Sequence, residues 1–114
     1  MGDNMLDIDM TSGRGILFVR LKGILNRRSS NKLHIEVTKL LKNIGIKNIV
    51  FNIDELSYID KYGVRAIKTS FKICTQNNGK TFICTDKKPS PIISKFQNTK
   101  VVTNELEAVK VIHS

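Results

Sequence analysis

The chain has 114 residues, of which 40% are hydrophobic and 25% are charged, and its formal net charge is +9. These values are ordinary for one globular domain, so we expect a single domain over residues 1–114. The longest apolar runs have about five residues, far short of the roughly 20 that span a bilayer, and the acidic N-terminus is not typical of a signal peptide. We therefore expect a cytoplasmic protein without a membrane span.

Positive charge is concentrated in two places. Nine basic residues and one acid, Glu36, lie between Thr11 and Ile53. Four more basic residues recur at i, i+4, i+7 and i+11 and predict a stripe on one helix face: Lys61, Arg65, Lys68 and Lys72. This distribution favours an acidic partner, which could be a protein, a membrane surface or nucleic acid.

No motif for catalysis or metal binding is evident. The two cysteines and two histidines have no metal-ligand spacing, so we expect no metal site and no cofactor. The glycine spacings of phosphate-binding loops are absent, and no Ser-His-Asp arrangement is visible. We therefore do not expect an enzyme.

The first part of the chain predicts a hairpin and a helix. Residues 5–10 alternate apolar and acidic side chains and residues 16–21 are mostly apolar, which predicts an antiparallel hairpin at a sheet edge. Apolar residues then recur at helical spacing. One of residues 29–31 would cap this helix, and Gly45 would end it.

A buried strand is expected to lead directly into a second helix. The β-branched run 48–53 is typical of a strand that is covered on both faces. Asp60 stands where the N-cap of a helix over about 61–77 is expected. The turn between them would lie at the carboxyl end of a sheet, where α/β proteins usually place binding surfaces.

The rest of the chain continues the alternation of strands and helices. We expect a strand at 80–85, a third helix from Ser90-Pro91, a short strand at 101–103 and a last helix capped by Asn104. This order predicts an α/β fold with a mixed, mostly parallel sheet, an N-terminal antiparallel hairpin and about four helices.

The segment Leu56-Ser-Tyr-Ile-Asp-Lys-Tyr-Gly63 resembles the central motif of the STAS domain, the fold of bacterial anti-sigma factor antagonists. Members of that family carry Asp-Ser-Ser-Gly, and the second serine is the usual phosphorylation site. Here the matching residues are Asp60-Lys61-Tyr62-Gly63. The segment Gly23-Ile-Leu-Asn26 also lies where the family usually has Gly-Glu-Leu-Asp. The resemblance covers nearly the whole chain.

The resemblance implies a non-enzymatic module that binds an anti-sigma factor or a related serine kinase. The expected partner-binding residues are Asn26, Arg27, Asp60, Lys61, Tyr62, Gly63 and Arg65. No phosphorylation is expected at the usual position, because a tyrosine replaces the serine there. The family's acid at position 26 is replaced by an amide with two arginines after it, which favours a more acidic partner.

Two alternatives and one local question follow from the same residues. The chain could be a scaffold or regulatory STAS subunit of a larger signalling or transport assembly. A persistent homo-oligomer would favour this alternative. Nucleic-acid binding is less expected, because few aromatic residues are available for stacking. Gly63 costs a helix about 1 kcal/mol relative to alanine, so either another backbone approaches it or it packs against a neighbouring element.

Overall fold

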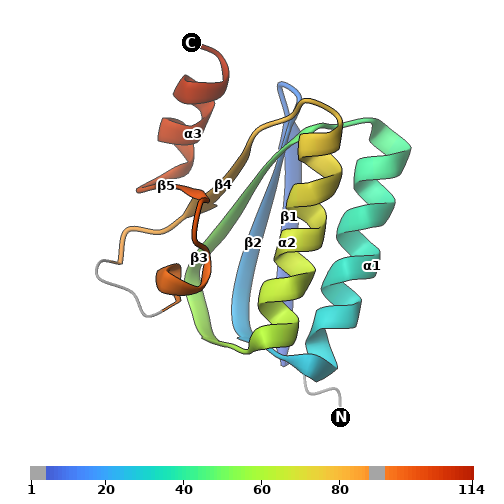
Figure 1. Cartoon of the computed structure of the whole chain (residues 1–114), viewed down its shortest axis with the longest axis vertical. Coiled ribbons are helices and arrows are strands. Elements are labelled where there is room, and N and C mark those ends of the chain that lie inside the picture. Colours follow the sequence, from blue (N-terminus) through green and yellow to red (C-terminus); the bar gives the residue numbers. More distant parts are fainter. Residues whose placement is uncertain (1–4, 88–91) are drawn as a thin grey trace.

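The computed structural model describes residues 5–87 and 92–114, and its centre is a five-stranded sheet in the order β1-β2-β3-β4-β5 (Figure 1). Strands β1 and β2 are antiparallel, and the later strands are parallel to β2. The strands are β1 (Leu6–Gly13), β2 (Ile16–Leu25), β3 (Asn48–Ile59), β4 (Thr81–Cys84) and β5 (Lys100–Val102). The predicted mixed sheet with an N-terminal hairpin is confirmed.

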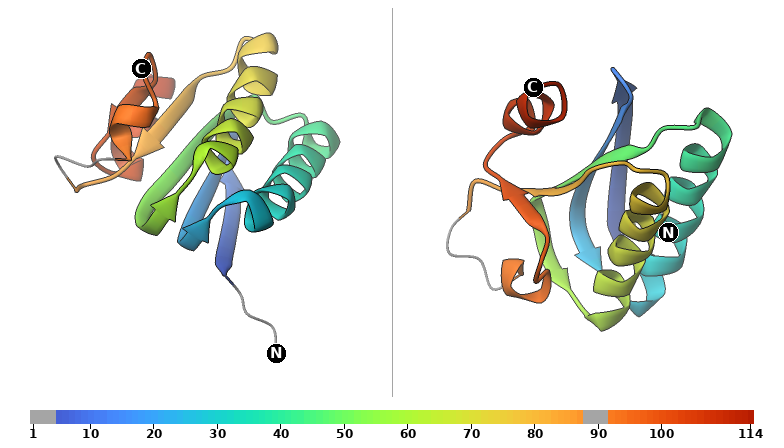
Figure 2. Two further views of the ribbon diagram at one scale, coloured as in Figure 1. Left: turned by 60° about the horizontal axis from the view of Figure 1, so that its bottom comes forward. Right: turned by 45° about the horizontal axis from the view of Figure 1, so that its top comes forward.

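In the described part of the chain, three α-helices form layers on the two faces of the sheet. They are α1 (Arg27–Ile44), α2 (Lys61–Gln76) and α3 (Glu105–Ile112). Helices α1 and α2 lie side by side on one face, and α3 lies on the opposite face (Figure 2). None of the helices in the described ranges is long and apolar enough to cross a membrane.

The alternation of side chains along the strands produces two separate cores. In β3, Ile49 and Phe51 face the layer of α1 and α2, while Val50 between them belongs to the cluster under α3. Both helices present buried apolar residues to the first core, among them Leu33 and Ile67. Because successive strand residues point to opposite faces, a nearly continuous apolar run fills both cores.

Three strands are longer than the sequence predicts, and the first of them, β1, runs to Gly13 instead of residue 10. Strand β3 continues to Ile59 because Leu56 and Ile59 stay buried and pair with Gly23 and Leu25 of β2. Ser57 and Tyr58 between them are exposed in the strand, and exposed polar residues of this kind also fit the turn that the sequence predicts. The longer β2 moves the start of α1 to Arg27, so Asn26 is its N-cap and the prediction of a cap within 29–31 is wrong.

The expected third helix begins outside the described residues, at Ser90-Pro91. The residues described next form a short 3-10 turn, η1 (Ile93–Lys95), before β5. The other predicted elements are confirmed, and Asp60 and Asn104 cap α2 and α3 as expected.

Candidate functional site

The candidate site is the corner where β2 and β3 end. These strands are parallel neighbours, and their last residues, Leu25 and Ile59, pair with each other. Each strand passes into a helix after one residue, so the N-termini of α1 and α2 lie side by side at one edge of the sheet (Figure 1). This topology brings together residues that are more than 30 positions apart in the sequence.

Asp60 joins the two helix starts with one carboxylate. Its Oδ1 accepts hydrogen bonds from the backbone N–H groups of Tyr62 and Gly63 at 2.9 and 3.0 Å. Its Oδ2 accepts a hydrogen bond from the N–H of Arg27 at 2.9 Å. Asp60 is therefore both the cap of α2 and a tie to α1, and this second role was not visible in the sequence.

The pKa of Asp60 reflects these bonds. Desolvation raises the pKa of the carboxyl, but the hydrogen bonds from Gly63, Arg27 and Tyr62 outweigh it and hold the pKa below its ordinary value. The positive charge of Lys95, in the turn η1, acts in the same direction. Lys95 is a neighbour that sequence reasoning missed, because only the folded chain brings residue 95 close to residue 60.

Asn26 caps α1 beside this carboxylate. Its Oδ1 accepts hydrogen bonds from the backbone N–H groups of Arg28 and Ser29, at 2.9 and 3.2 Å. The buried hydroxyl of Ser29 accepts from the N–H of Asn26 and donates to the carbonyl of Ile24. Asn26 therefore serves the structure of the corner through the acceptor oxygen that an asparagine shares with an aspartate.

Gly63 is buried at the point where α2 meets the ends of both strands. A Cβ atom there would lie 2.7 Å from the Leu25 carbonyl oxygen and 2.8 Å from Ile59 Cγ1. The glycine is thus required by close packing against β2 and β3. It shapes the corner, and it is buried there.

Comparison with known proteins is decisive for the family. The model of the STAS domain matches residues 7–108. The chain belongs to the STAS domain family. This STAS domain is 28% identical over 79 residues to an anti-sigma F factor antagonist from Paenibacillus polymyxa, covering 69% of this chain and 68% of the relative.

Two solved structures have the same fold as this STAS domain. The anti-sigma factor antagonist SpoIIAA in its unphosphorylated form superposes with a TM-score of 0.79 at 20% identity, over 95% of this chain and 99% of that chain. The Bacillus cell-fate determinant SpoIIAA in the phosphorylated form gives 0.73 at 19% identity, over 93% and 99%. These two likenesses show that the fold is shared.

Tyr62 is the aromatic centre of the corner in this STAS domain. Its side chain is half-buried, and three cations lie over its ring. The distances to the ring centroid are 5.6 Å for Arg27, 5.4 Å for Lys61 and 5.7 Å for Arg65. Since all three cations are exposed, the ring and its cations form a surface that a partner can reach.

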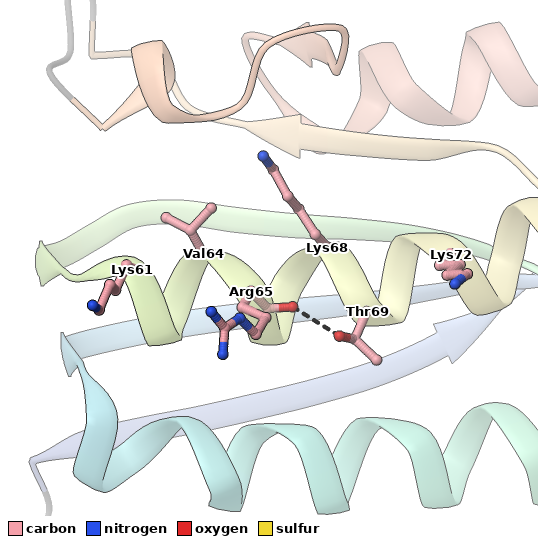
Figure 3. A pocket seen from close by; sticks show the side chains of 6 residues that line it. All are labelled: Lys61, Val64, Arg65, Lys68, Thr69 and Lys72. Carbon is pink, nitrogen blue, oxygen red and sulfur yellow. Dashed lines mark hydrogen bonds between the residues drawn. The ribbon is translucent and has the colours of Figure 1, made fainter.

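Two open grooves begin at the corner of the STAS domain, and Tyr62 lines the first of them. One lies between α1 and α2 and is lined by Ser30, Asn31, His34, Tyr62, Arg65, Ala66 and Thr69. The other, of about 370 Å³, follows α2 and is lined by Lys61, Val64, Arg65, Lys68, Thr69 and Lys72 (Figure 3). Neither groove is lined by an acid.

Of the residues singled out from the sequence, the structure brings all seven to the corner but divides their roles. Asn26, Asp60 and Gly63 hold the backbone in place. Arg27, Lys61, Tyr62 and Arg65 present the accessible groups.

Proposed function

We propose that this STAS domain is a non-enzymatic antagonist that binds an anti-sigma factor or a related switch kinase through the corner of α1 and α2. The observation that carries the proposal is the Asp60 carboxylate, which accepts three backbone hydrogen bonds from two helix starts. A corner held in this way is already ordered before a partner arrives, so binding costs less conformational entropy.

The accessible groups of the corner suit a protein partner. Tyrosine and arginine are the residues most often enriched among interface hot spots. Tyr62 offers both a ring face and a hydroxyl, and Arg27 and Arg65 flank it. Binding at this corner would sequester the partner protein and so free the sigma factor that the partner holds.

We further propose that phosphate does not control this interaction at the usual place. A serine kinase has no serine to modify in the turn of residues 60–63. A phosphoserine would add about −1.5 to −2 charges at this corner, whereas this chain keeps three cations around Tyr62. The sign of the corner therefore stays positive whatever the activity of the kinase.

The direct test is binding of the purified chain to each anti-sigma factor kinase of the organism that encodes it. We expect one of them to bind, and Tyr62→Ala to weaken that complex by about thirtyfold, as the loss of a hot spot near 2 kcal/mol implies. Leu106→Ala is the control, because Leu106 is 61% exposed and lies on α3, on the face of the sheet opposite to α1 and α2.

The same mixtures test the absence of control by phosphate. With ATP present, mass spectrometry should find no phosphate on residues 60–63 of the wild-type chain. Stoichiometric phosphate there would refute this part of the proposal, and failure of every anti-sigma factor to bind would refute the whole of it.

A further inference from the structure

Helix α2 carries an uncompensated row of cations beyond the corner. Its sequence contains four basic residues and no acid. All four are exposed, and they line the groove along the helix: Lys61, Arg65, Lys68 and Lys72. Figure 3 shows that Val64 and Lys68 point to one side of α2, while Arg65 and Thr69 point toward the side of α1.

These cations have no anionic partner within the described part of the chain. The ion pairs found there involve Arg20 and Lys22, which lie on β2. Asp60, which directly precedes the row in the sequence, accepts hydrogen bonds from three backbone N–H groups. No ion pair among the described residues therefore neutralises the row of α2.

The neighbouring helix does not supply the missing negative charge. Helix α1 has five basic residues and a single acid, Glu36. Because α1 and α2 lie side by side on one face (Figure 1), they form one positively charged layer. Like charges gathered in this way repel one another, and a partner of opposite charge would reduce this repulsion.

We propose that the docking face of this STAS domain continues from the corner along α2 as far as Lys72, and that the partner covers it with a surface of Asp and Glu carboxylates. This inference rests on the proposed function, since it names the chemistry of the same partner. From Lys61 to Lys72 the helix rises about 16 Å, so the carboxylates must be spread over a similar length.

The surroundings of the row favour a protein over other polyanions. Half-buried Val64 lies in the groove between Lys61 and Lys68, and it offers an apolar contact that a phosphate backbone cannot use. The large exposed hydrophobic residues of the described chain are Ile35, Ile44, Tyr58 and Leu106, none of which is on α2. A membrane surface would therefore find no apolar anchor in this row.

Charge reversal tests the inference. Against the anti-sigma factor that binds the wild type, Lys68→Glu with Lys72→Glu should weaken binding by at least about tenfold, chiefly through a slower association rate, and should flatten its salt dependence. The matched control is Lys100→Glu with Lys110→Glu, two exposed residues on β5 and α3. It changes the net charge equally and should alter the affinity less than about twofold.

A zero-length carbodiimide cross-link provides a second readout, because it joins lysine amines to carboxylates in contact. We expect mass spectrometry to find Lys68 or Lys72 joined to an Asp or Glu of the partner. Equal weakening by both variant pairs, or an intact affinity for the α2 pair, would overturn the inference while leaving the proposed function standing. Tighter binding of the wild type to a DNA duplex or to phosphatidylserine vesicles than to every anti-sigma factor would overturn both.

Discussion

The two faces of the sheet use basic residues in opposite ways. Under α3, Arg20 donates hydrogen bonds to both carboxylate oxygens of Glu105 at 2.9 and 2.7 Å and to Asp9 at 2.9 Å. Asn52 also donates to Glu105. On the other face, the cations of α2 have no such partners among the described residues. One set of charges therefore joins distant elements of the fold, while the other forms no ion pair among the described residues.

The pKa of Glu105 reflects its ion pair with Arg20. The hydrogen bonds from Arg20 hold the pKa of Glu105 below its ordinary value, although desolvation opposes them. The pair joins β2 to the start of α3, across 85 residues of sequence. Thus α3 is fastened by its first residue as well as by its apolar contacts with the second core.

The largest expected effect is at Gly63, where the corner depends on close packing. Gly63→Ala should destabilise the domain by about 2–3 kcal/mol, because the new Cβ would collide with the backbone of Leu25. Urea denaturation measures this loss. Gly13→Ala is the control, since a Cβ there meets nothing within 4 Å, and it should cost less than about 0.5 kcal/mol. Equal stability of the two variants would contradict the packing role.

The next effect concerns the tie between the two helix starts. Asp60→Ala should cost about 2 kcal/mol, the upper end for a helix cap, because three N–H groups lose their acceptor. Hydrogen exchange of the Arg27, Tyr62 and Gly63 amides would report the loss at both helices. If only the amides of α2 became less protected, the carboxylate would be a cap and not a tie.

Loss of the ion pair between Arg20 and Glu105 should cost less stability than loss of Asp60. Arg20→Ala should destabilise the domain by about 1 kcal/mol, because the partly buried carboxylate of Glu105 loses its cation. The loss is limited because 37% of the Arg20 side chain is exposed, and solvent weakens an ion pair at the surface. Lys22→Ala is the control, since its contact with Glu55 is 3.8 Å long and both side chains are about two-thirds exposed. Equal losses would remove the contrast between the paired residues.

Low pH should remove the contributions of both Asp60 and Glu105 to the stability of the domain. The pKa values of Asp60 and Glu105 are lowered in the folded chain. Their contribution to stability is therefore complete above the ordinary values near about 4, and it is lost as the pH falls through the lowered native values. Denaturation at pH 5 and pH 3 should show this loss, and the variant Asp60→Asn with Glu105→Gln should show less of it.

The smallest effect is expected on the row of α2. Lys68→Ala and Lys72→Ala should each change the free energy of unfolding by less than about 0.5 kcal/mol, with a slight gain at low salt from reduced repulsion. The comparison with Arg20→Ala at the same ionic strength measures the contrast between the two faces directly. A loss as large as that of Arg20→Ala would mean that the row serves the fold.

Several features of this STAS domain followed from local sequence alone. The hairpin, the cap at Asp60 and the αL cap at Gly45 were predictable because turns and caps depend on residues a few positions apart. The row of cations on α2 was also predictable, because helical spacing by itself places residues on one face. The ends of β2 and β3 were not, because polar residues in the exposed positions of a paired strand look like a turn.

Only the tertiary structure decided how the charges are used. Arg20 and Lys68 look alike in the sequence, yet Glu105 reaches only the first of them. In the same way, one carboxylate of Asp60 serves Arg27 as well as its own helix, because the parallel strands end at the same edge. Contacts between distant residues depend on strand order and on which face each helix covers, and no local pattern encodes either.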